Sequence, residues 1–319
     1  MIRCGSLEAA ERAGSVGVER VSVRQVRSLA EASPEEWGWA QTAELLLLRP
    51  ALGEAGPLGL APAVPAALAV EVLRWLGRPV EATTLVYSGN QVDGRSLERL
   101  GYLPPWKALD LAGAPRWAAG ARQTWARLAV PLPAAAFAAH NLVLIAALGT
   151  HPTERMVGCL ETLLGLLPDA GRADLRPARP ELAALLLRLW PPDLCILDAR
   201  RVYRWDEVDR FTRLPGGPIL IGNDPLAVDT AAALLLGLRP QEVPLLAGTR
   251  RALRRPWPDV GSLEPLGAPP APSRHLREAR LRAAAGRLAW RIRRRTDRLL
   301  KKMDLPRLVG FIRRVQDGQ

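Results

Sequence analysis

Short apolar runs without polar interruption recur along most of the chain, and each ends near a turn-forming residue. They occupy residues 44–49, 83–87, 142–148, 194–197 and 219–221. Runs of this length that are apolar throughout, instead of alternating with polar residues, indicate strands buried on both faces of a sheet. We therefore predict five buried strands at these positions.

Between these runs, apolar residues return at the spacing of one helical face. The predicted helices cover 65–77, a short segment after Asp93, 153–168, a segment after Pro180, and 224–237. Thr153 and Asp224 are residue types that cap helix N-termini, and Pro225 suits the first helical position. Strands alternating with helices predict an α/β fold with a mostly parallel sheet and helices on both faces.

The charge is concentrated in the last part of the chain. Of the formal net charge of +12, residues 274–319 hold 15 basic and 4 acidic residues, whereas the other residues hold 29 basic and 28 acidic ones. A Pro-rich stretch at 266–273 precedes this basic part and is typical of a semi-rigid linker. We therefore divide the chain into an α/β domain at 1–265, a linker at 266–273 and a basic amphipathic helical tail at 274–319.

Two roles for the tail at 274–319 remain open. Its apolar stripe could pack on the α/β domain and leave the arginine face in solvent. Alternatively, it could attach the protein to an anionic membrane surface or to nucleic acid, and Trp290 beside Arg291 suits either partner. The N-terminus shows no apolar segment typical of a signal peptide, so we expect a cytoplasmic protein, with peripheral membrane attachment as one possibility.

The three cysteines, Cys4, Cys159 and Cys195, form no Cys-x-x-Cys pair. The sequence therefore contains no local zinc or iron–sulfur motif, and Cys159 and Cys195 are expected to be small core residues. It also lacks the glycine-rich dinucleotide and P-loop signatures and the His-Glu-x-x-His motif. We expect no cofactor, and no motif assigns metal ligands.

Three segments in this order resemble one known family. They are Asn141 to His151, Pro192 to Ala199, and the run Gly222-Asn223-Asp224-Pro225-Leu226-Ala227-Val228-Asp229. Together they resemble the family called domain of unknown function 362, over roughly residues 40 to 248. The resemblance implies the same α/β fold but no particular reaction. Many relatives carry ferredoxin-type cysteines, and because this chain has none, no iron–sulfur cluster is expected.

The resemblance also shows where this chain departs from the family pattern. Arg49-Pro50-Ala51 stands where the family usually has Lys-Pro-Asn, and Gly149-Thr150-His151 where it has Lys-Thr-His. Glu161-Thr162 replaces the usual Lys-Asn. If the lysines serve an anionic ligand or proton transfer in relatives, that chemistry is weakened or lost here.

In an open parallel sheet, ligands bind beyond the carboxyl ends of the strands. The polar residues expected to meet there and bind a small anionic ligand or metal are Arg49, Thr150, His151, Asn223, Asp224 and Asp229. Ser88, Asn90 and Asp198 follow or end other strands. Structural alternatives stand beside this prediction, because Asp224 is also a helix cap, Asp229 complements a helix dipole and Asp198 has a local partner in Arg200.

No Ser-His-Asp or Cys-His set can be assembled, so the sequence leaves open whether the protein is an enzyme. Two functions stay in view. The first is an α/β protein, or a degenerate enzyme that keeps the fold, that binds a small anion or metal at the loops after the strands. The second is an adaptor attached to a membrane surface or nucleic acid through residues 274–319.

Overall fold

The computed structural model describes residues 23–37, 46–51, 63–87, 94–111, 116–117, 132–133, 141–151, 154–167, 178–205 and 211–267. Its strands are β1 (Arg24–Val26), β2 (Leu46–Pro50), β3 (Thr83–Tyr87), β4 (Lys107–Asp110), β5 (Arg116–Trp117), β6 (Leu132–Pro133), β7 (Asn141–His151), β8 (Arg155–Val157), β9 (Leu194–Trp205), β10 (Phe211–Arg213) and β11 (Ile219–Gly222).

The α-helices of this part are α2 (Ala66–Trp75), α3 (Gly94–Arg99), α4 (Cys159–Leu164), α5 (Arg179–Leu189), α6 (Pro225–Leu235) and α7 (Pro244–Leu253). Short 3₁₀ segments are η2 (Leu29–Glu31), η3 (Pro34–Trp37), η4 (Val80–Ala82) and η7 (Pro240–Glu242). None of the helices in the described ranges is long and apolar enough to cross a membrane.

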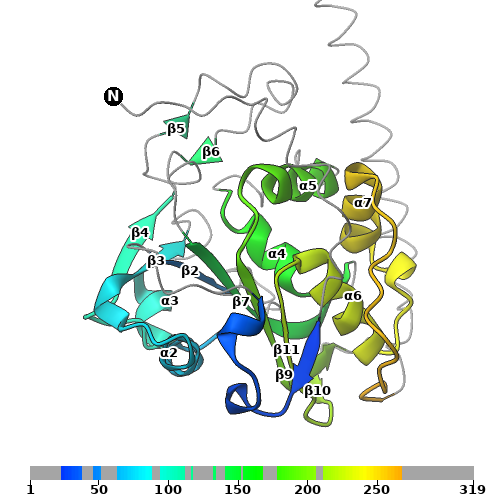
Figure 1. The fold of residues 1–319 in the computed structure, drawn as a ribbon, viewed down its shortest axis with the longest axis horizontal. Helices are drawn as coiled ribbons and strands as arrows, with labels where there is room; N and C mark the ends of the chain where they lie inside the picture. The colour runs from blue at the N-terminus through cyan, green and yellow to red at the C-terminus, as the bar shows by residue number, and fades with distance from the viewer. Residues whose placement is uncertain are drawn as a thin grey trace, which may run out of the picture.

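A nine-stranded sheet forms the centre of the molecule (Figure 1). Seven strands follow the order β1-β11-β9-β7-β2-β3-β4, and two more lie off this path, with β10 paired to β9 and β8 paired to β7. The four pairs among β4, β3, β2, β7 and β9 are parallel. The outer strands β8, β10, β11 and β1 pair antiparallel. The predicted α/β fold with a mostly parallel sheet is therefore confirmed.

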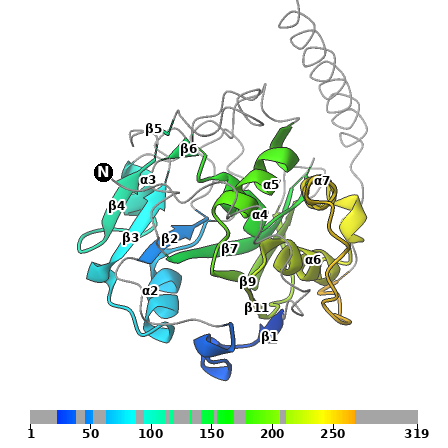
Figure 2. The same ribbon diagram turned by 45° about the horizontal axis from the view of Figure 1, so that its top comes forward.

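Helices cover both faces of this sheet, as predicted (Figure 2). Alternate residues of β7 show how the two layers form. Leu142 and Leu144 pack in the core beneath α4, α5, α6 and α7, whereas Val143 and Ile145 pack in the core beneath α2 and α3. Successive side chains of a strand point to opposite faces of the sheet. A strand that is apolar at every position therefore contributes apolar side chains to the cores on both faces.

All five predicted strands are present, but the last one runs in an unexpected direction. β11 pairs antiparallel with β9, with Ile219 opposite Asp198 and Gly222 opposite Cys195. β10 already pairs antiparallel with the far end of β9. The chain therefore folds back along β9 as a hairpin instead of crossing over through a helix, which a parallel neighbour would need.

The helix predicted from Thr153 is corrected as well. The chain leaves β7, turns back as β8, and the helix begins only at Cys159, after the N-cap residue Gly158. Thr153 itself lies outside the described residues. The helix predicted from Asp224, by contrast, is confirmed, because the Asp224 side chain accepts a hydrogen bond from the Leu226 backbone N–H.

The linker predicted at 266–273 and the tail predicted at 274–319 lie outside the described residues, except for Leu266 and Gly267. The Leu266 backbone N–H donates to the Leu235 carbonyl at the end of α6 (2.8 Å). Its side chain lies against Gly217. Leu266 is thus part of the packed α/β body.

Candidate functional site

Arg49 is a buried arginine near the carboxyl end of β2, with 3% of its surface exposed. Its Nη1 donates to the carbonyl of Val86 on β3 (3.2 Å), and its Nε donates to the carbonyl of Thr162 in α4 (3.4 Å). The side chain shares the sheet face of Leu47, beneath α4. Arg49 therefore joins the carboxyl edge of the parallel strands to the last turn of α4.

The guanidinium of Arg49 packs against Gly165, where a Cβ atom would come within 2.0 Å of Nη2. Burial lowers the pKa of Arg49 to about 10. None of the ion pairs found within the described ranges includes this residue. Its positive charge is met there by carbonyl oxygens and by the negative end of the α4 dipole, and not by a carboxylate.

Thr150 and His151 lie at the far end of β7, beyond the region paired with β2. Pro50 is opposite Ile145, so β7 continues for six more residues, or roughly 20 Å, before it ends at His151. Thr150 is 3% exposed. The Nδ1 atom of His151 accepts a hydrogen bond from the Glu154 backbone N–H (3.0 Å), which holds the turn between β7 and β8.

Charged residues that the sequence analysis missed surround this turn. Arg155, buried and in the left-handed region at φ 66°, pairs with Glu242 (2.7 Å). Arg179 of α5 pairs with Glu154 (3.7 Å) and with Glu161 of α4. The partners in these ion pairs are far apart in the sequence, so no residue spacing predicts them. Glu161, the acid in place of a family lysine, is thus neutralised by an arginine.

Asn223 and Asp224 lie at the opposite edge of the sheet. Because β11 is antiparallel to β9, its last residue, Gly222, sits beside Cys195 at the start of β9. Asn223 is exposed. Asp224 caps α6 and also accepts a hydrogen bond from Arg255 Nη1 (3.2 Å). Burial raises the pKa of Asp224, while its backbone hydrogen bond and Arg255 oppose the shift.

Asp229 lies inside the molecule, with 2% of its surface exposed. Its two oxygens accept hydrogen bonds from the backbone N–H groups of Cys159 (2.7 Å) and Leu160 (2.9 Å). Both bonds satisfy N–H groups that the first turn of α4 leaves without intrahelical partners. Burial raises the pKa of Asp229 to about 7, although the two hydrogen bonds act in the opposite direction.

The single crevice expected from the sequence is therefore not formed by these six residues. Arg49 lies near the end of β2, Thr150 and His151 far out on β7, Asn223 and Asp224 at the other edge, and Asp229 in the core. The reason is the reversed direction of β11, which carries the Asp224 turn away from the carboxyl ends of β7 and β2. Ser88 and Asn90 lie outside the described residues.

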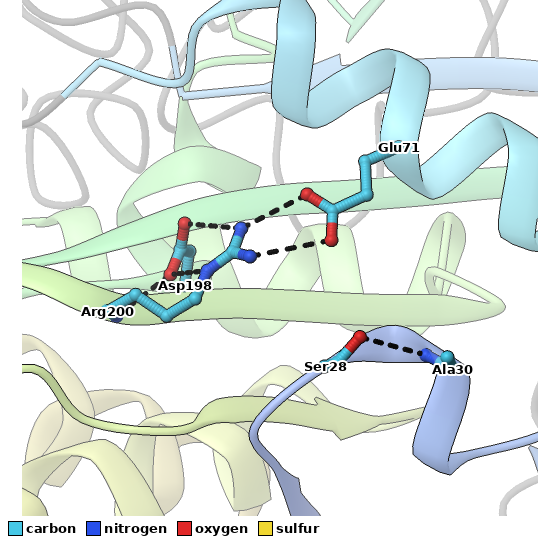
Figure 3. A network of polar contacts seen from close by, with 5 residues as sticks. All are labelled: Ser28, Ala30, Glu71, Asp198 and Arg200. Atoms are coloured by element: carbon cyan, nitrogen blue, oxygen red, sulfur yellow. Dashed lines mark hydrogen bonds and ion pairs between the residues drawn. The ribbon is translucent and has the colours of Figure 1, made fainter.

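Asp198 forms the local ion pair that the sequence suggested as its structural alternative (Figure 3). Its Oδ1 accepts from the Arg200 Nε (3.0 Å) and its Oδ2 from Nη2 (3.1 Å). The same guanidinium reaches Glu71 of α2 at 3.3 and 3.4 Å. Asp198 therefore ties β9 to α2 through Arg200.

Within the described ranges, no three His, Cys, Asp or Glu side chains are arranged to hold a metal ion. Cys159 and Cys195 are fully buried free thiols, which confirms their predicted place in the core. Burial is the main reason that the pKa of both thiols is raised.

A comparison against known family models identifies the family of this chain. The profile described as "Domain of unknown function (DUF362)" matches residues 46–234, from the start of β2 to the last turn of α6. The match covers more than half of the chain, and the protein belongs to this family. Searches of curated proteins and of solved structures gave no match.

Proposed function

We propose that this protein binds a small anion, carrying a carboxylate or phosphate group, at the guanidinium of Arg49. The observation that supports the proposal is a buried arginine near the carboxyl edge of parallel strands whose hydrogen bonds within the described ranges run to two carbonyl groups. Ligands of open α/β sheets bind at this edge. Arginine is also the side chain best shaped for carboxylate and phosphate groups.

The physical reason is the cost of burying a charge without a counter-charge. A buried ion is stabilised only when it is paired and fully hydrogen-bonded, and the lowered pKa of Arg49 reflects its desolvation. An anion beside the guanidinium would supply the counter-charge that no carboxylate of the described residues supplies. The hydroxyl of Tyr102, which donates to the Val64 carbonyl (3.1 Å), is a further buried polar group in electrostatic contact with Arg49.

Binding without turnover is the form of the proposal that fits the residues best. Of the three motif positions at which the family usually has lysine, only Arg49 keeps a cation, while Gly149 and Glu161 do not. Glu161 is paired with Arg179. The chain thus retains one charged group suited to holding an anion and lacks the other two lysines.

A thermal-shift titration tests the proposal with inorganic phosphate and with a dicarboxylate such as malonate as separate probes. The full chain is compared with Arg49→Lys and Arg49→Met, each measured against its own melting temperature without ligand. At 100-fold excess over Kd, binding stabilises the folded state by about 2.7 kcal/mol, which corresponds to a rise of several degrees. Arg49→Lys should keep part of this rise, and Arg49→Met should lose it.

The exposed arginine Arg99 on α3 provides the matched control. Because phosphate stabilises many proteins without specific binding, Arg99→Met must respond as the unchanged protein does. An equal ligand-induced rise in Arg49→Met and Arg99→Met would refute the site. A response to only one probe would identify the anion class.

A second candidate function rests on the uneven charge of the sequence. The excess of eleven positive charges in residues 274–319 suits attachment to an anionic membrane surface or to nucleic acid. Replacing Arg293, Arg294 and Arg295 by serine in the full chain should then weaken binding to anionic vesicles or to an oligonucleotide, and lower its salt dependence. Unchanged binding of both probes would reject this function.

A further inference from the structure

Five arginines gather at the carboxyl-terminal end of α7. They are Arg188 from the end of α5 and Arg250, Arg251, Arg254 and Arg255 from α7 and the turn after it. We refer to them as the α7 arginine cluster. Arg254 has φ 58°, so the chain changes direction there in the left-handed conformation that ends many helices.

Hydrogen bonds show that these side chains lie around one helix end. Arg188 Nη2 donates to the carbonyl of Ala252 (3.1 Å), and Arg250 Nη1 donates to the carbonyl of Arg255 (3.0 Å). The Arg250 guanidinium also lies over the ring of Trp257, 4.9 Å from its centroid. These contacts bring together guanidinium groups from two helices.

The cluster carries far more positive than negative charge. Within the described part of the chain, its one ion pair joins Arg255 to Asp224 (3.2 Å). Arg251 and Arg254 are exposed, and the hydrogen bond found for the Arg251 side chain runs to the carbonyl of Ala247. Part of the positive charge is offset by the negative end of the α7 dipole, but four guanidinium groups have no carboxylate in ion-pair contact there.

We propose that the α7 arginine cluster binds the phosphate backbone of nucleic acid. Guanidinium groups form paired hydrogen bonds with phosphate oxygens, and several of them on one surface allow contacts with more than one phosphate of a strand. Contacts of this kind do not read the base sequence. Binding is therefore expected to be independent of sequence and sensitive to salt.

The apolar surface favours nucleic acid over a membrane as the partner. A membrane-bound surface usually inserts large apolar side chains among the lipids. Among the described residues, the one large hydrophobic side chain that is strongly exposed is Leu103, which belongs to the segment before β4 and not to the cluster. The aromatic ring nearest the cluster, Trp257, is partly buried against the core.

Fluorescence anisotropy with a labelled oligonucleotide of arbitrary sequence tests this proposal on the full chain. The double variant Arg251→Glu, Arg254→Glu changes two exposed residues of the cluster. Loss of two phosphate contacts should lower the slope of log affinity against log salt by about 2, and weaken binding roughly 10- to 100-fold near 0.1 M salt. The matched control, Arg95→Glu, Arg99→Glu on α3, has the same charge change and should bind nearly as the unchanged chain does.

Two results would overturn the proposal. If both double variants lose affinity equally, the effect is one of net charge or of residues outside the cluster. If the cluster variant loses binding to anionic lipid vesicles while it still binds the oligonucleotide normally, the partner is a membrane. Neither result bears on the anion site proposed at Arg49, because that site is tested separately, by the thermal shifts with phosphate and malonate.

Discussion

Asp229 and Arg49, which are far apart in the sequence, hold the two ends of the same six-residue helix. The Asp229 carboxylate accepts hydrogen bonds from the first N–H groups of α4, and the Arg49 guanidinium donates to the Thr162 carbonyl in its last turn. An ionised Asp229 and the Arg49 guanidinium each have the sign that the helix dipole favours at that end, although for Asp229 the cost of burying the charge is larger. Because a helix this short is not stable alone, these buried contacts are a main reason that α4 forms.

The stability of the protein should fall as pH rises through the range in which Asp229 ionises. Its pKa of about 7 lies well above the usual value of roughly 3.9 in an unfolded chain, so the folded state binds the proton more tightly. The stabilisation that comes from the protonated Asp229 side chain is fully present below about pH 4. It is lost as the pH rises through about 7. Urea unfolding between pH 4.5 and 7.5 should show a decline on the order of 2–4 kcal/mol.

Asp229→Asn serves as the control for this pH dependence. An asparagine can accept one of the two backbone hydrogen bonds but does not titrate, so the variant should be destabilised yet show a much flatter pH profile. A profile as steep as that of the unchanged protein would assign the effect to other buried carboxyls, such as Asp193 and Asp224, whose pKa values burial also raises.

Alanine at Gly158 or Gly165 should destabilise the fold. A Cβ at Gly158 would lie 2.4 Å from Asp229 Oδ1, and one at Gly165 would lie 2.0 Å from Arg49 Nη2. Neither glycine has a positive φ, so crowding of the two charged groups is the expected cause. Each variant should lose about 1–3 kcal/mol of unfolding free energy in urea titrations.

Gly94→Ala on α3 is the matched substitution without crowding, since nothing lies within 4 Å of the added Cβ. It should be neutral or slightly stabilising, because alanine restricts the unfolded chain. If Gly158→Ala and Gly165→Ala behave like Gly94→Ala, then α4 is not held as closely by Asp229 and Arg49 as the structure indicates.

Removing Arg200 should loosen the contact between β9 and α2. Its guanidinium joins Asp198 and Glu71, as Figure 3 shows, but about a third of it is exposed to solvent. Solvent screening limits the effect, and Arg200→Met should cost about 0.5–1.5 kcal/mol in urea unfolding. Arg201→Met, at the exposed neighbouring position, should have a smaller effect. Equal effects at both positions would mean that the network contributes little.

Cys159 and Cys195 should resist thiol reagents in the native protein. Both are fully buried, and burial raises the pKa of each thiol, so little reactive thiolate is present. In a Cys4→Ser variant, a coloured disulfide reagent at pH 8 should label no thiol before denaturation and two thiols after it. Rapid labelling of native protein would show that this part of the core opens readily.

The pattern of apolar residues was sufficient to locate the strands and the two-sided sheet, because a run that is apolar at every position must be covered on both faces. Local signals also located α6, whose cap Asp224 and first residue Pro225 act within the helix itself. The segment between β9 and β11 lacks the apolar pattern of a crossover helix, and this available sign would have predicted the antiparallel direction of β11.

Other features were decided by the tertiary structure alone. The start of α4 depends on a carboxylate from α6, so Thr153 gave a false local signal. The burial of Arg49 against the carbonyl groups of Val86 and Thr162 depends on the meeting of β2, β3 and α4. Strand and cap patterns are properties of neighbouring residues and can be read from the sequence. The partners of a buried charge come from distant segments, and only the packed fold brings them together.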